Sequence, residues 1–311
     1  MQTTNILKTS HRTQGYAICL AGTVIWSTTG ILIRYLTETY ALPSLVLAFW
    51  RDLFVTLGLG TALLVIQPAL LQPGRKHLPF LFVYGFIVSL FNSTWTVSVA
   101  LNGAAVATVL AYSAPAFTAV LGWWLLHEKL SALKVGVVIA CILGCALVAG
   151  AYDPATWQLN PLGLITGLVS GGLFAAYNLM GKYANQRGLN SWSTLLYAFG
   201  VAMLFLLAYN VVPSLASGRG WVGDLGWLGS SLPGWGVLLL LGIGPTIGGY
   251  GLYTLSLSYL PMSVASLIAT LEPAFTAILA YFLLNEQMAP PQVIGSAVII
   301  GSVLLLRLRE G

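Results

Sequence analysis

The chain has 311 residues, of which 58% are hydrophobic and only 7% are charged, and its net charge is +5. A soluble domain has about 25% charged residues, so this chain has too few ionisable groups to cover a soluble surface of its size. Apolar runs of about 20 residues recur along it, which indicates membrane-spanning helices. The basic excess is not a nucleic-acid signature, because it comes from short loops between these runs.

Ten helices are predicted, because proline, glycine and asparagine breaks divide the apolar runs. Nine or eleven spans are alternatives, since 78–126 and 234–284 each continue through very short turns. The first apolar run is too long for a signal peptide and lacks an obvious cleavage site, so it is expected to stay as a helix. The predicted ranges are 15–36, 43–66, 78–101, 104–126, 132–150, 160–182, 190–212, 234–258, 261–284 and 290–307.

The basic residues fall on one side of this predicted topology. Ten of the 13 Lys and Arg residues lie in the loops and termini of one side, whereas only Arg34 and Arg219 lie on the other. Loops rich in Lys and Arg stay in the cytoplasm. The sequence therefore predicts an integral protein of the plasma or inner membrane, with both termini cytoplasmic and an even number of spans.

The stretch 262–288 repeats 104–130 without a gap, and 12 of the 27 aligned pairs are identical. A proline, a Phe-Thr pair and a glutamate recur at fixed spacing, so the chain is predicted to be a duplication. Each copy holds five helices, an odd number, so the second copy enters the membrane from the opposite side, as in many secondary transporters. The predicted units are a cytoplasmic segment 1–14, a first repeat 15–150, a linker 151–159, a second repeat 160–307 and a tail 308–311.

Polar and aromatic residues gather in corresponding helices of the two copies. Aromatic rings with a few hydroxyls and amides suit a site for a small, partly apolar solute. The alternative is that these polar groups bond between helices. The candidate substrate-binding residues are Trp26, Thr29, Arg51, Asn92, Trp95, Tyr112, Tyr177, Asn178, Tyr250, Tyr253 and Glu272.

Arg51 and Asp52 are charged residues inside the second predicted helix, roughly 12 Å past Pro43 at 1.5 Å per residue. A lone charge there is costly, so it should face protein or a water-filled cavity. As neighbours in a helix, the two are not expected to pair on one face. A structural tie to helix-end carbonyls is the alternative to a binding role for Arg51.

Glu272 lies near the membrane midplane, about 15 Å into a core roughly 30 Å thick. An ionised carboxylate is costly there, unless a cation such as Arg51 compensates. Pro273 supplies no N–H, so the carbonyl of Ala269 loses its helical donor, and a protonated Glu272 could donate to it. This makes proton coupling a possibility, and a purely structural role at the kink is the alternative.

Other motifs are expected to be structural. Glu128 and Glu286 follow the last apolar residues of their helices and are assigned to the turns there. His127 is too isolated for a metal site. The cysteines lie inside apolar runs and are expected to be buried and unpaired. A glycine every four residues in the sixth helix predicts a close-packing seam. That seam is Gly163, Gly167 and Gly171.

These features resemble the EamA-type family of the drug/metabolite transporter superfamily over essentially the whole chain. The resemblance rests on the two five-helix halves, on Trp26-Ser27 and on Arg51 after Phe49. It rests also on the repeat that ends Pro115…Glu128 and Leu271-Glu272-Pro273…Glu286. It implies a ten-helix inverted-repeat carrier with a central cavity, and members are often exporters of amino acids or other metabolites. The sequence departs from the family at His127-Glu128 and Asn285-Glu286, where many members have Gly-Glu.

The functional prediction is a secondary transporter for a small neutral or zwitterionic metabolite, with amino acids and export favoured, working by alternating access. Sparse charge inside the spans argues against strongly anionic cargo. The expected partners are the solute and the lipid bilayer, without nucleic acid, cofactor or metal. The alternatives are a non-transporting scaffold or receptor, and a membrane-embedded enzyme. The enzyme is disfavoured because paired carboxylates, a nucleophile–His set and a metal cluster are not evident in the sequence. A primary pump is not suggested, since neither an ATP-binding loop nor a redox motif is evident.

Overall fold

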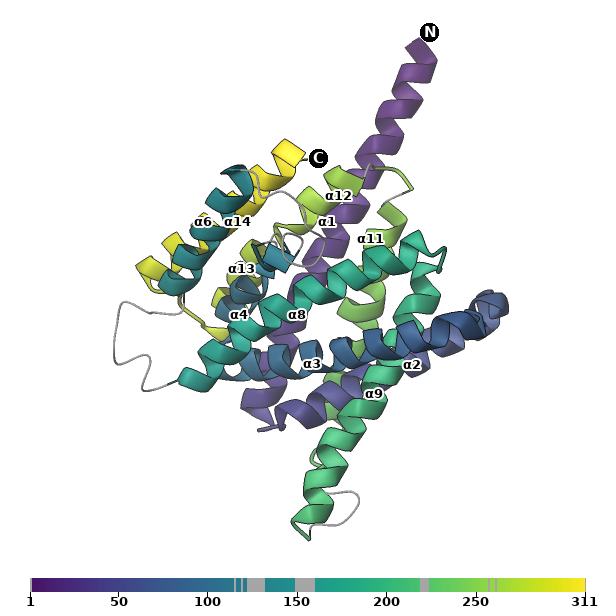
Figure 1. Cartoon of the computed structure of the whole chain (residues 1–311), viewed down its shortest axis with the longest axis vertical. Helices are drawn as coiled ribbons and strands as arrows, with labels where there is room; N and C mark the ends of the chain where they lie inside the picture. The colour runs from purple at the N-terminus through teal and green to yellow at the C-terminus, as the bar shows by residue number, and fades with distance from the viewer. Residues whose placement is uncertain are drawn as a thin grey trace.

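The computed structural model describes residues 2–114, 116–118, 120–121, 132–148, 160–218, 224–256, 258–260 and 262–310. Within these ranges the structure is helical and contains no strand (Figure 1). The helices of the first half are α1 (Gln2–Thr39), α2 (Ser44–Ile66), α3 (Leu78–Asn102), α4 (Ala104–Ala111) and α6 (Ala132–Val148). Short 3₁₀ turns η1 (Pro68–Leu71) and η2 (Arg75–His77) connect α2 to α3. The second half has α8 (Pro161–Gln186), α9 (Ser191–Ala216), α10 (Leu232–Leu241), η3 (Gly242–Gly249), α11 (Tyr250–Ser256), α12 (Met262–Ala269), α13 (Glu272–Leu284) and α14 (Pro290–Glu310).

Six helical segments in the described part of the chain are long and apolar enough to cross a membrane. They are Thr13–Thr39, Ser44–Ile66, Arg75–Asn102, Pro161–Gln186, Ser191–Ala216 and Leu232–Ser256. Four shorter apolar helices accompany them, at Ala104–Thr118, Val135–Val148, Glu272–Leu284 and Pro290–Leu305. The chain is therefore a membrane protein built of helices. The predicted number of ten spans and their directions remain predictions.

The helices pack in pairs that join distant parts of the chain. α3 lies against α8 and α9, and α2 also packs on α9. α1 lies against η3, α11 and α13. α6 and α14 run side by side at one edge of the molecule (Figure 1). The first half therefore packs extensively on the second, and both contribute to one bundle.

The fourth and ninth predicted helices are interrupted at equivalent positions. α4 ends at Ala111, and helical residues resume at Ala114 after a turn. α12 ends at Ala269, and α13 begins at Glu272 after a turn. The two breaks are separated by the same 158 positions that relate the repeated stretches (269 − 111). The prediction of continuous helices over 104–126 and 261–284 was wrong at these points. Pro273 explains the second break. It has no N–H to donate to the carbonyl of Ala269, four residues earlier, and its ring crowds that carbonyl. Pro115 lies outside the described residues.

The eighth predicted helix is also interrupted, by the wider π turn η3. Pro245 lies within η3 and has no N–H, so it cannot donate to the carbonyl of Leu241, four residues earlier. The hydroxyl of Thr246 donates to that carbonyl instead, at 3.1 Å. Single π turns inside α-helices commonly mark functional sites.

The remaining predicted boundaries hold within a few residues, with two exceptions. α1 begins at Gln2 and not at 15, since no strong helix breaker stands between them. α9 continues through Pro213, which was expected to end it, as far as Ala216. At the end of α13, Asn285 adopts the left-handed conformation, with φ of 57°. Asparagine tolerates this conformation better than most residues, so it replaces the glycine that is common at such ends.

The glycine seam predicted in α8 is confirmed. A Cβ placed on Gly163 would lie 2.5 Å from Asn102, and one on Gly171 would lie 3.0 Å from the carbonyl oxygen of Leu110. These contacts bring α8 close to the end of α3 and to α4. Gly15 makes the matching contact in the other half, since a Cβ there would lie 2.9 Å from the side chain of Leu260.

Candidate functional site

Aromatic rings of α3 and α8 form a continuous stack inside the bundle, which we call the α3–α8 cluster: Phe91, Trp95, Phe174 and Tyr177. Phe91 stacks on Phe174 with ring centroids 5.3 Å apart, and on Trp95 at 6.3 Å. Tyr177 lies 6.0 Å from Phe174. The predicted residues Trp95 and Tyr177 are thus brought together, and two phenylalanines that were not predicted connect them.

A second group, the α1–α11 cluster, consists of Trp26, Tyr250 and Tyr253. The ring of Trp26 lies 5.4 Å from Tyr253 and 6.4 Å from Tyr250. Gly249 permits this approach, because a Cβ there would lie 2.9 Å from the Trp26 ring. Three predicted residues therefore meet between α1 and α11.

Tyr112 and Glu272 meet at the two helix breaks. The Tyr112 hydroxyl lies 2.7 Å from Glu272 Oε2 and 3.0 Å from the carbonyl oxygen of Ala269. The Tyr112 ring also lies 6.3 Å from Phe174, so it adjoins the α3–α8 cluster. The carbonyl that Pro273 was predicted to free from its helical donor is thus met by a tyrosine from the other half.

Arg51, Asp52 and Asn92 form a buried polar group between α2 and α3. Arg51 Nε lies 3.1 Å from Asp52 Oδ1, and Asn92 Nδ2 donates to Asp52 Oδ2 at 2.7 Å. The expectation that Arg51 and Asp52 do not pair was wrong, because the long arginine side chain reaches back to its neighbour. Arg51 is 3% exposed and Asp52 is 0% exposed, so both charges are removed from solvent.

One nitrogen of this group is unsatisfied. Arg51 Nη2 has no hydrogen-bond partner among the described residues, although it is buried. The guanidinium carbon lies 6.0 Å from the ring of Trp95, which is within reach of a cation–π contact. The buried ion pair therefore adjoins the α3–α8 cluster and offers it a donor. Asp52 was not among the predicted site residues.

Two predicted residues do not join these groups. The Thr29 hydroxyl donates to the carbonyl of Trp26 in its own helix, at 2.6 Å. Asn178 is exposed, since it follows Tyr177 directly and so points in another direction around α8. Periodicity could have separated Asn178 from Tyr177, and it could have linked Phe174 to Tyr177 three residues on.

Glu286 binds a different helix from the one that it follows. Its carboxylate accepts from the backbone N–H groups of Ala104, at 3.0 Å, and Ala105, at 3.3 Å. These groups open α4 and have no partner within the helix. Arg34 Nε lies 3.4 Å from Glu286 Oε1. Glu286 was expected to act only in the turn after its own helix, but it also caps the first turn of α4. Glu128 and His127 lie outside the described residues.

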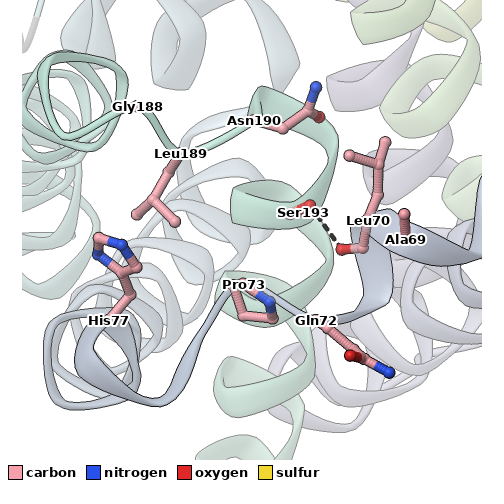
Figure 2. Close-up of a pocket in the computed structure, with 9 residues that line it drawn as sticks. All are labelled: Ala69, Leu70, Gln72, Pro73, His77, Gly188, Leu189, Asn190 and Ser193. Carbon is pink, nitrogen blue, oxygen red and sulfur yellow. Dashed lines mark hydrogen bonds between the residues drawn. The ribbon is translucent and has the colours of Figure 1, made fainter.

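A surface cavity of about 190 Å³ is lined by none of the predicted site residues. It is formed by the α2–α3 connection and the α8–α9 turn, and the His77 ring points into it (Figure 2). The Ser193 hydroxyl closes one wall by donating to the Leu70 carbonyl, at 2.6 Å. An adjoining depression is lined by the basic side chains Lys76, His77 and Arg187. The predicted topology places the loops that form this cavity on the cytoplasmic side of the membrane.

The cysteines are free and buried, as predicted; they are Cys19, Cys141 and Cys145. Within the described ranges, no three His, Cys, Asp or Glu side chains are arranged to hold a metal ion.

The fold and these sites define a polytopic helical membrane protein with buried aromatic and polar groups at the meeting of two halves. Comparison with known proteins identifies the class. The model of the EamA-like transporter family matches residues 13–150 and again 161–308. The chain belongs to this family, and the family identifies it as a membrane transporter.

Similar proteins are also described as transporters, and the similarity covers most of their length. The uncharacterized transporter YwfM of Bacillus subtilis is 25% identical, over 92% of this chain and 91% of that protein. The uncharacterized inner membrane transporter YicL of Salmonella typhimurium is 23% identical, over 95% of each chain. A solved crystal structure has the same fold, with a TM-score of 0.59 and 17% identity over 96% of this chain and 100% of that one.

Proposed function

We propose that the protein is a secondary carrier that moves a small neutral or zwitterionic metabolite by alternating access, through ten helices arranged as two inverted repeats. The observation that carries this proposal is the pair of equivalent helix breaks, after Ala111 and after Ala269. Broken helices at corresponding positions of two halves commonly form the central site of such carriers, because their freed backbone groups can bind solutes. Tyr112 and Glu272 lie at these breaks.

The packing of the helices supports the inverted repeat. α3 packs on α8, and the equivalent elements of the other half, η3 and α11, pack on α1. Likewise α4 packs on α8, and its equivalent α12 packs on α1. In each case a first-half helix packs on α8, and the equivalent second-half helix packs on α1. This exchange is the pattern that a pseudo-twofold axis would produce.

The chemistry of the site supports a zwitterion with an apolar or aromatic part. The buried Arg51 Nη2 has no partner among the described residues and can bind a carboxylate. The faces of the α3–α8 rings can take an ammonium group or an apolar side chain. Amino acids carry these groups together. Export is favoured because members of the family that the sequence resembles are often exporters. The similarity to YicL, an inner membrane transporter, supports an inner-membrane location.

A non-transporting scaffold or receptor is the competing function. It could share the fold and bind a solute, but it would not move solute across a membrane. Flux through purified protein in liposomes separates the two, whereas binding alone does not.

The test is a thermal-shift screen of the purified protein against amino acids and related metabolites, followed by flux measurements on the compounds that stabilise it. We expect at least one amino acid to stabilise the protein and to cross protein-containing liposomes faster than empty ones. Trp95→Ala should abolish this flux. Phe82→Ala is the matched control, because Phe82 is on the same helix but 56% exposed. Binding without flux would favour the scaffold or receptor, and an equal loss in both variants would remove the α3–α8 cluster from the site.

A further inference from the structure

The Tyr112 hydroxyl carries one proton and lies near two oxygen atoms of the described residues, Ala269 O and Glu272 Oε2. Ala269 O lies 3.0 Å away and Glu272 Oε2 lies 2.7 Å away, both within hydrogen-bond distance. A backbone carbonyl only accepts, and a tyrosine hydroxyl donates once. An ionised carboxylate also only accepts. A single hydroxyl proton donated to both oxygens would be shared between them. Two full bonds therefore form together only when the Glu272 carboxyl carries a proton and donates it to the Tyr112 oxygen.

We propose that Tyr112, Glu272 and the Ala269 carbonyl form a proton-binding site, in which the Tyr112 hydroxyl changes its acceptor when Glu272 loses its proton. With the proton bound, Glu272 donates to Tyr112, and Tyr112 donates to Ala269. When the Glu272 O–H bond breaks and the proton leaves to water, the Tyr112 hydroxyl turns to the carboxylate. The Ala269 carbonyl then has neither this donor nor one from Pro273, which has no N–H.

The surroundings leave Glu272 without a compensating cation in the described part of the chain. α13 packs on α1 and α4. Tyr112, beside the end of α4, is the titratable group in contact with Glu272. On α1, Arg34 pairs with Glu38 and with Glu286, at the opposite end of α13. Arg51, the partner considered from the sequence, pairs with Asp52.

The acceptor change connects protonation to the geometry of the breaks. Tyr112 lies in the break after α4, and Ala269 is the last residue of α12. The bound proton therefore lets Tyr112 bond to both sides of the second break, and proton loss releases Ala269 while Tyr112 stays bonded to Glu272. This inference rests on the proposed function, in which movement at the breaks exposes the solute to each side. It adds the proton as the ion that drives the movement.

The proton site can be tested without knowing the solute. Infrared spectra of the purified protein, titrated over pH, separate the C=O stretch of a protonated carboxyl from that of a carboxylate. The chain has only 8 Asp and Glu residues, so the assignment is tractable. We expect one buried protonated carboxyl, lost in Glu272→Gln and shifted in Tyr112→Phe. Glu38→Gln and Tyr16→Phe are matched controls, because these side chains are exposed, and they should leave the band unchanged.

Absence of the band from the parent protein, or its persistence in Glu272→Gln, would overturn the proposal. Flux supplies the second readout, because glutamine can donate to Tyr112 as the protonated acid does but cannot titrate. Glu272→Gln should therefore abolish the pH dependence of whatever flux remains. An unchanged pH profile would refute the proton site while leaving the carrier intact. Conversely, an intact infrared signature without flux of any solute would refute the carrier alone.

Discussion

The carboxylate of Glu286 accepts a hydrogen bond from the backbone N–H of Ala104 at 3.0 Å, although the two residues are 182 positions apart. Glu286 follows the last helix turn of α13, and Ala104 opens α4. An acidic side chain favours this place because the first N–H groups of a helix are unpaired and carry partial positive charge. The contact ties equivalent broken helices of the two halves together at one end of the molecule.

Glu286→Ala should lower the stability of the folded protein by about 1–2 kcal/mol, through loss of the cap and of the favourable interaction with the helix dipole. The midpoint of thermal unfolding in detergent measures this. Glu38→Ala is the matched control, because Glu38 also pairs with Arg34 but is 48% exposed. It should change stability by less than about 1 kcal/mol, as exposed ion pairs do. Equal midpoints for the two variants would show that the cap does not stabilise the fold.

The sequence predicted the existence of the helices better than their continuity. Apolar length and proline and glycine breaks located the helices of the described residues, because these signals are local. A kink at Pro273 was expected, but full interruptions of the helices after Ala111 and Ala269 were not, because the stretches on both sides of each break are apolar. The cap of α4 was missed for another reason. Glu286 was assigned to the turn that follows its helix, because a sequence does not show which distant backbone N–H groups a carboxylate will contact.

The crossing of α6 and α14 gives a second prediction. A Cβ placed on Gly295 would lie 2.6 Å from the carbonyl oxygen of Gly144, and one on Gly144 would lie 2.9 Å from that of Gly295. Backbone atoms cannot yield as a side chain can, so Gly295→Ala should cost about 1–3 kcal/mol through overpacking. Gly136→Ala and Gly301→Ala are controls on the same helices, since a Cβ there meets nothing within 4 Å. Thermal unfolding should separate Gly295→Ala from both controls, and a similar midpoint for all three would contradict the tight crossing.

The predicted ten-span topology can be tested by labelling single cysteines. In a background lacking the native cysteines, Cys at Ser217 should react with an impermeant thiol reagent added outside the cell. Cys at Ser10 should react only after permeabilisation, because the basic loops place the N-terminus in the cytoplasm. The native cysteines are buried, so their replacement by serine or alanine should leave the exposed surface unchanged. Labelling of both positions from outside would refute the ten-span topology.

The candidate site was predicted only in part. Trp95 and Tyr177 meet through Phe91 and Phe174, and those two phenylalanines carry no polar atom that would have singled them out. Asp52 was not among the predicted site residues, although it follows Arg51 directly in α2. Its partner Asn92 stands on another helix, and only the packing of α2 on α3 brings the two together.

The Arg51–Asp52 pair separates a binding role from a structural one. Removing one partner of a buried ion pair leaves the other charge uncompensated, so Arg51→Ala should cost about 3–5 kcal/mol. The double variant Arg51→Met with Asp52→Leu removes both charges and keeps apolar volume, and it should recover most of that stability. Thermal unfolding of the single and double variants measures the recovery.

If Arg51 Nη2 binds the solute, the double variant should be folded, abundant and unable to move solute in liposomes. The physical reason is that its stability no longer depends on the ion pair, whereas a solute carboxylate would still need the guanidinium. Asp52→Asn provides the comparison, because it keeps an acceptor for Asn92 and leaves the guanidinium in place. It should bind solute more readily than the double variant. Recovery of flux together with stability in the double variant would assign Arg51 a purely structural role and remove it from the binding site.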